Sequence, residues 1–179
     1  GLRQACPTTA DTVNNTFGTI NSITNSFWRP QRDTSGVTAW NTSNEGLIQL
    51  DAIYQNCTRG QEKPDLIVTT NAIKSLINIM TILNGQNNYN MGAAKGELGF
   101  DDVFYRKARV LSDDNCPAET LYLVNTRHFR FAVLKKGEFK TTKMKEPIDG
   151  LYSIMQMYVF CNFTGSARRL LGVMTGITG

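Results

Sequence analysis

The sequence has few of the side chains that most often carry enzyme chemistry. Its only histidine is His128, and its four cysteines, Cys6, Cys57, Cys116 and Cys161, are dispersed with no Cys-x-x-Cys pair. A zinc site needs clustered thiolates or imidazoles, and a serine hydrolase needs a nucleophile beside a histidine base. The chain also has no Gly-x-Ser-x-Gly elbow. We therefore expect no metal, no cofactor, no small-molecule substrate and no enzymatic activity.

Long hydrophobic runs are also missing. No apolar stretch approaches the ~20 residues that a membrane-spanning helix needs, and the polar residues 1–17 do not resemble a signal peptide. These features predict no membrane association and thiols that stay reduced and mostly buried. Because the chain begins with Gly1, we expect that some upstream sequence has been removed.

What is present suits a folded protein. The 179 residues are 41% hydrophobic and 19% charged, which is enough for one domain or for two small lobes that share a core. The net charge of +4 permits contact with nucleic acid. It does not by itself indicate such a role, because dedicated nucleic-acid-binding proteins concentrate their positive charge.

Residues 1–43 are predicted to be extended and rich in loops. They contain many Asn, Thr, Ser and Gly residues, and their apolar residues are isolated, so the segment cannot build a core of its own. We expect these apolar residues to dock on the rest of the protein or on a neighbouring subunit: Val13, Phe17, Ile20, Ile23, Phe27, Trp28 and Trp40.

A first helix is predicted over residues 44–59, with Asn44 as its N-cap and Gly60 as its stop. Its apolar residues recur every three or four positions and form one stripe. Two further isoleucines widen the stripe, so we expect the helix to be covered on more than one side. The stripe consists of Leu47, Leu50, Tyr54 and Cys57, widened by Ile48 and Ile53.

A buried strand over residues 65–70 leads directly into a second helix. Thr70 or Asn71 caps this helix, and Gly85 ends it. We expect one face of the helix to form a core with the apolar residues of the strand. This core consists of Leu66, Ile67 and Val68 from the strand and Ile73, Leu76, Ile77, Met80 and Leu83 from the helix.

Short strands are predicted throughout the second half of the chain. The strand over residues 105–111 carries basic residues and should be partly exposed, and a further strand covers residues 121–124. Apolar and polar residues alternate over 129–133, which indicates a half-buried strand. Residues 154–163 are apolar on both faces and are predicted to lie inside a sheet. A closing strand is expected over 168–177, and the fold class is α+β.

Three features resemble functional motifs only superficially. Asp101-Asp102 and Asp113-Asp114 stand in polar, turn-like settings, so we interpret them as solvated turns and not as acid–base pairs. The Gly-spaced segment 92–99 lacks the Gly-Lys-Ser/Thr ending of a phosphate loop and is interpreted as a surface loop. His128 is expected to be structural or to face solvent.

A dense run of lysines occupies residues 135–145. It is consistent both with a solvated hairpin arm and with a charged contact to a neighbouring subunit or to packaged nucleic acid. Two arginines directly precede the closing strand and suit an ion pair at an edge or an interface. The candidate contact residues are Lys135, Lys136, Lys140, Lys143, Lys145, Arg168 and Arg169.

The order of these elements resembles the major capsid protein of tailed phages, with the fold first seen in phage Hong Kong 97. A capped helix is followed by Pro-Asp-Leu-Ile-Val-Thr at residues 64–69, which enters a helix, and then by a long loop. Residues 114–126 are similar to the polar turn and strand of that family, and Trp28-Arg29 resembles its aromatic-basic patch. The resemblance covers most of the chain as a pattern of elements and short phrases.

The resemblance implies a Hong Kong 97-like fold. In that fold a peripheral domain with a spine helix is joined to an axial domain, which has a small mixed sheet flanked by helices. Residues 1–63 would then form an extended segment and the spine helix, residues 64–151 the axial domain, and residues 152–179 the strands that return to the peripheral domain.

The function that the resemblance implies is that of a structural subunit of an icosahedral phage capsid. Such subunits assemble into pentamers and hexamers that enclose the genome. The main partner would be the chain itself, with packaged DNA and portal or scaffold proteins as further candidates, in a virion assembled in the host cytoplasm. The alternatives are an encapsulin-like nanocompartment shell, a small α+β enzyme and a nucleic-acid-binding module.

The chain departs from the family in one respect. The N-terminal arm and the extended β-hairpin loop, which embrace neighbouring subunits in the family, have no counterpart before Gly1. We therefore expect this chain to be the C-terminal portion of a longer capsid protein. We expect it to fold alone but to form monomers or weak rings and not closed shells.

Overall fold

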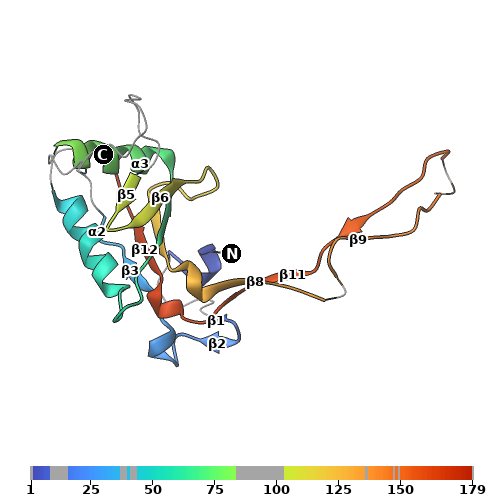
Figure 1. Ribbon diagram of the computed structural model, residues 1–179, viewed down its shortest axis with the longest axis horizontal. Helices are drawn as coiled ribbons and strands as arrows, with labels where there is room; N and C mark the ends of the chain where they lie inside the picture. The colour runs from blue at the N-terminus through green and yellow to red at the C-terminus, as the bar shows by residue number, and fades with distance from the viewer. Residues whose placement is uncertain are drawn as a thin grey trace.

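The protein consists of a body, from which a long arm projects (Figure 1). The computed structural model describes residues 2–8, 16–36, 40, 44–83, 103–135, 137–146, 148 and 150–178. None of the helices in these ranges is long and apolar enough to cross a membrane.

A mixed sheet of six strands forms the centre of the body. Neighbouring strands pair antiparallel except for β12 with β3 and β4 with β6, which pair parallel. The fold class is therefore α+β, as the sequence predicts. In spatial order the strands are β3 (Gln31–Asp33), β12 (Gly172–Thr175), β7 (Thr120–Val124), β4 (Leu66–Thr69), β6 (Ala108–Ser112) and β5 (Val103–Tyr105).

Two helices, α2 (Glu45–Asn56) and α3 (Asn71–Leu83), belong to the core on one face of the sheet. Ile67 of β4 points into this core, and both neighbours of Ile67 point to the other face, as the alternation along a strand requires. The predicted core of strand and helix is confirmed for Ile67, Ile73, Ile77 and Met80, which are buried. It is wrong for Leu66 and Val68, which pack in the cluster on the other face of the sheet.

The N-terminal segment covers the opposite face of the sheet. It contributes the short helix α1 (Leu2–Ala5), the hairpin of β1 (Thr16–Phe17) with β2 (Ile20–Asn21), and the 3-10 turn η1 (Ser26–Trp28). Phe17 and Trp28 are buried against Tyr122, Leu171 and Val173. Because both faces of the sheet are covered, every residue of β7 is buried. The expectation that the isolated aromatic residues dock on the body is confirmed for these two side chains.

The arm comprises residues 129–165 and contains two short antiparallel ladders. Next to the body, β8 (Phe129–Val133) pairs with β11 (Cys161–Gly165), and further out β9 (Lys140–Thr141) pairs with β10 (Met157–Tyr158). Figure 1 shows the arm extending away from the body on one side. We use the name "arm" for the described residues of this range.

Several predicted strands differ from the observed structure. Residues 105–111 do not form one strand, because the chain turns at Arg106 and Lys107, between β5 and β6. Residues 154–163 do not lie inside a sheet: they belong to the exposed arm, where each ladder has only two strands. Residues 168–177 form the 3-10 turn η3 (Arg168–Leu170) followed by β12.

Helix α2 is confirmed, with three differences from the prediction. It ends at Asn56, and the Asn44 side chain makes no capping hydrogen bond. Ile48 is 65% exposed, so the helix is not covered on that side, whereas Ile53 is buried. The sheet draws strands from residues 1–63, 64–151 and 152–179, and the proposed division into domains remains a prediction. The predicted surface loop at 92–99 and Asp101-Asp102 lie outside the described residues.

Candidate functional site

The structure places the predicted lysines along the arm. Lys135, Lys140, Lys143 and Lys145 are exposed, and Lys145 forms an isolated bridge with Ile154 beyond the outer ladder. Lys136 lies outside the described residues. These lysines therefore lie on an exposed hairpin arm, and their contact with a partner remains a prediction.

The two arginines before β12 have different environments. Arg169 is exposed, but Arg168 is buried with 1% of its surface accessible. The Arg168 Nε donates a hydrogen bond to the Ala5 carbonyl, and its guanidinium lies 5.9 Å from the centre of the Phe17 ring. Arg168 thus ties the N-terminal segment to the body, and an ion pair at an edge or an interface remains a prediction for these two arginines.

The arm exposes an unusual amount of apolar surface. Fourteen of the nineteen large apolar side chains that are exposed among the described residues lie between Phe131 and Phe160. Phe139, Met144 and Met157 are among them, each with more than half of its surface accessible. An isolated two-stranded hairpin is only marginally stable in water, and large exposed apolar patches mark sites of protein association. The arm therefore has the properties of a segment that another protein surface covers.

Aromatic packing attaches the arm to the body. The rings of Phe129 and Phe163, which lie opposite each other on β8 and β11, are stacked with their centres 4.6 Å apart. Both rings contact the core formed under the N-terminal segment. At Gly165 an added Cβ would lie 3.1 Å from the Phe17 ring and 3.3 Å from the Phe129 ring. The backbone of β11 therefore passes close to this aromatic group.

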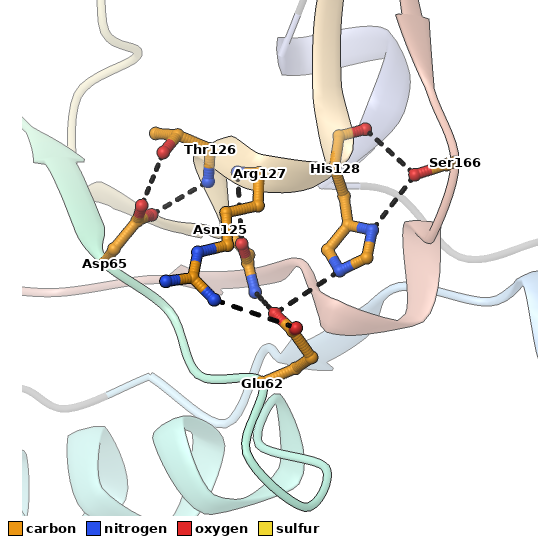
Figure 2. Close-up of polar contacts among 7 residues, drawn as sticks. All are labelled: Glu62, Asp65, Asn125, Thr126, Arg127, His128 and Ser166. Atoms are coloured by element: carbon orange, nitrogen blue, oxygen red, sulfur yellow. Dashed lines mark hydrogen bonds and ion pairs between the residues drawn. The ribbon is translucent and has the colours of Figure 1, made fainter.

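A cluster of polar side chains lies beside this attachment and surrounds Glu62 (Figure 2). Asn125 is 1% exposed and donates a hydrogen bond of 3.1 Å from Nδ2 to Glu62 Oε2. His128 Nε2 lies 3.5 Å from the same oxygen, and Arg127 lies 3.9 Å from Oε1. Three side chains thus converge on the Glu62 carboxylate: that of Asn125 and those of Arg127 and His128 in the following 3-10 turn η2 (Thr126–His128).

Two further contacts complete the cluster, which we call the polar joint: Glu62, Asp65, Asn125, Thr126, Arg127, His128 and Ser166. Asp65 accepts hydrogen bonds from the backbone N–H and the hydroxyl of Thr126. On the other side, His128 Nδ1 lies 3.0 Å from Ser166 Oγ, and the Ser166 N–H donates to the His128 carbonyl over 2.9 Å. The joint therefore connects the loop before β4 with both strands at the base of the arm.

Ser166, His128 and Glu62 have the order of a hydrolase triad, but their setting differs. A working triad presents its nucleophile to a substrate cleft. The cleft beside the joint is lined by Glu62, Asn125 and Arg127, whereas Ser166 and His128 do not line it. Ser166 also continues the pairing of β8 with β11 through its backbone. We interpret the cluster as a structural joint of the arm.

Most residues of the joint could not be found from local sequence patterns. Glu62 and Ser166 lie in short polar stretches without a motif, and Asp65 lies in the Pro-Asp-Leu-Ile-Val-Thr phrase, which indicated a strand and not a polar site. Asn125 gave a weak signal as a polar residue that directly follows a fully apolar strand. The three segments of the joint come together only through the pairing of β4 with β7 and of β8 with β11.

The cysteines are arranged as structural thiols. Cys6 and Cys57 are buried, and burial raises the pKa of the Cys57 thiol from 9.0 to about 12. Burial likewise raises the pKa of Cys6, although Arg168 acts in the opposite direction. Cys161 lies exposed on β11. In the described ranges, no three His, Cys, Asp or Glu side chains form a group that could hold a metal ion.

The sequence matches no protein-family model and no curated protein. Among solved structures it matches a chain of the Cyanophage A-1(L) capsid asymmetric unit, with a TM-score of 0.64 and 18% sequence identity. The two chains share a fold. The match covers 100% of this chain and 59% of the phage chain, so this chain spans less than two thirds of the length of its structural neighbour.

Proposed function

We propose that the protein is a structural subunit of a phage capsid with a Hong Kong 97-like fold. The observation that carries the proposal is the similarity of the entire chain to a chain of the Cyanophage A-1(L) capsid asymmetric unit. An identity of 18% is low, so the proposal also needs support from the surface of this chain. That support comes from the arm.

The arm is suited to contacts between subunits. Shell subunits associate through many repeated contacts, and apolar patches surrounded by charge are typical of such surfaces. In the arm, apolar side chains such as Phe139 and Met144 alternate with Lys140, Lys143 and Lys145. The apolar groups would supply the free energy of association, and the lysines would orient the contact or approach packaged DNA.

Shortening the arm tests this proposal. Residues 134–160 are replaced with Asn-Gly, a sequence that favours a tight hairpin turn. The replacement joins Val133 to Cys161, which are paired in the native ladder. The body should fold as before, because neither of its core clusters includes a residue from 134–160.

The full chain and the shortened chain are then compared by size-exclusion chromatography with light scattering and by electron microscopy. We expect the full chain to associate, and the mean mass of the shortened chain to fall while its circular dichroism still shows a folded body. A full chain that stays monomeric at every protein concentration and salt concentration would contradict the proposal. Equal association of both chains would exclude the arm as the contact.

A further inference from the structure

An open cleft of about 640 Å³ lies on the body, beside the polar joint. Its walls come from the end of α2, the loop before β4, the turn between β5 and β6, and the residues after β7. Four cationic side chains and two carboxylates line it: Lys63, Arg106, Lys107, Arg127, Glu62 and Asp65. The lining therefore has a formal excess of positive charge.

The excess charge is concentrated on two lysines. Both carboxylates of the lining are engaged, because Glu62 is held by the polar joint and Asp65 by Thr126. Arg106 is likewise engaged, with its guanidinium 2.6 Å from Asp51. Lys63 and Lys107 are exposed, and neither has an ion-pair or hydrogen-bond partner within the described ranges.

The turn that carries Arg106 and Lys107 has a strained backbone. Arg106 and Lys107 form the two-residue turn between β5 and β6, and both have positive φ, 46° and 73°. Such turns favour Asn-Gly, because side chains with a Cβ are strained in this region. Strained backbone of this kind occurs often at functional sites. Here it places two cations at the rim of the cleft.

The opposite end of the same sheet carries the complementary charge. Strand β6 begins just after Lys107, at the cleft, and ends at Ser112. Strand β7 begins after the turn over residues 113–119 and ends just before Asn125, which is again at the cleft. The turn over residues 113–119 therefore lies at the end of the sheet that is far from the cleft. Asp114 and Glu119 are exposed on this turn, and no partner is recorded for either side chain within the described ranges. The body thus has two unpaired cations at one end and two unpaired carboxylates at the other.

The acidic turn is small and already ordered. Asp113 Oδ1 accepts a hydrogen bond of 2.9 Å from the Asn115 N–H, and the Asp113 carbonyl accepts one of 3.0 Å from the Cys116 N–H. The residues between Asp114 and Glu119 have small side chains: Asn115, Cys116, Pro117 and Ala118. A preorganised turn loses little entropy when it binds, and a cleft of this size accommodates a short turn.

We propose that the cleft binds the turn over residues 113–119 of a second copy of this chain. In this contact Lys63 and Lys107 face Asp114 and Glu119 of the neighbour. Because the two surfaces differ and lie at opposite ends of the body, the contact is head-to-tail, and repetition generates a ring or an open chain. The inference rests on the proposed shell function, for which it identifies one contact between neighbours in addition to the arm.

Charge reversal in the full chain tests this contact. One variant carries Lys63→Glu and Lys107→Glu in the cleft, a second carries Asp114→Lys and Glu119→Lys in the turn, and a third combines all four changes. The first two variants change the net charge in opposite directions, and the third has the native net charge, so net charge alone cannot explain a common effect. Self-association is measured by sedimentation velocity at low and high salt, and folding by circular dichroism.

Each reversal alone places like charges together, so we expect the apparent affinity of self-association to fall by about 100-fold at low salt. The difference should shrink at high salt, because exposed charges are screened within about 10 Å at 0.1 M ionic strength. The fourfold variant should regain the native affinity, and an equimolar mixture of the two double variants should associate more tightly than either double variant alone.

The outcomes separate this inference from the proposed function. If the native chain associates and the double variants associate equally well, the head-to-tail contact is wrong and the shell function stands. If the double variants associate more weakly but neither the fourfold variant nor the mixture recovers the native affinity, the pairing of cleft and turn is wrong. If the native chain does not associate under any condition, both the contact and the proposed function fail.

Discussion

Replacing Gly46 with alanine should destabilise the protein through the ring of Trp40. Gly46 lies in the first turn of α2, and an added Cβ would stand 2.4 Å from Cε2, 2.5 Å from Cδ2 and 2.7 Å from Cγ of the Trp40 ring. Real Cβ contacts essentially never fall below 3.0 Å. Trp40 has 0% of its surface exposed, so its rigid ring has no free space into which it could move.

The size of the effect follows from two opposing contributions. Overpacking a core costs about 1–3 kcal/mol, and a rigid buried ring places this case near the upper limit. Alanine stabilises a helix by at most about 1 kcal/mol relative to glycine. The free energy of unfolding should therefore fall by about 2 kcal/mol, which corresponds to about a 30-fold change in the unfolding equilibrium constant.

Urea unfolding followed by circular dichroism measures this change. The matched experiment introduces Gly46→Ala into a Trp40→Ala background, where the ring is gone. There the alanine should be neutral or should stabilise the protein slightly, so the double-mutant cycle isolates the contact between the two positions. The same cost in both backgrounds, or no cost in the native protein, would refute the reasoning.

Three further predictions concern α3 and the thiols. Ile77→Ala should lower the free energy of unfolding by about 2–5 kcal/mol, because Ile77 is fully buried. Ile79→Ala, at an exposed position two residues further along α3, should lower it by less than about 1 kcal/mol. Equal losses in urea unfolding would mean that the buried face of α3 is wrongly assigned. Cys161 should react readily with a thiol reagent in the folded protein, whereas Cys6 and Cys57 should react only after unfolding, as mass spectrometry of labelled peptides would reveal. Because burial raises the pKa of Cys57 from 9.0 to about 12, the unfolded chain releases this proton first. The contribution of Cys57 to stability should therefore be constant below pH 9 and should decrease as the pH rises towards 12. A Cys57→Ala variant should show a smaller decrease over this range, and an unchanged profile would contradict the assignment.

The elements with strong local signals could be predicted from the sequence. A short apolar strand followed directly by an amphipathic segment sufficed for β4 and α3, because both signals depend on residues close together in the chain. The turn between β5 and β6 was missed because Arg106-Lys107 contains neither glycine nor asparagine. Local patterns detect such a turn only when its residues have the usual conformational preferences.

The exposure of residues 154–163 in the arm could not be predicted, for a different reason. Residues 154–163 are apolar on both faces, which predicts burial, but a sequence pattern does not indicate which surface provides it. Among the residues that the structure describes, no surface covers them, and they are exposed. The polar joint and the cleft could not be predicted from the sequence, because Glu62, Asn125 and Ser166 come from segments that only the strand pairing brings together.

The position of β12 in the sheet has a consequence for the order in which the protein folds. This strand is the last in the sequence, yet it lies between β3 and β7 and is the only recorded partner of β3. During synthesis, β3 therefore cannot pair in the sheet until β12 has been made, and until then one edge of β7 is unpaired. Pairing across such a long separation is slow, because loop closure precedes the contacts that compensate for it. The sheet is therefore completed only after the exposed apolar residues of the arm have been made.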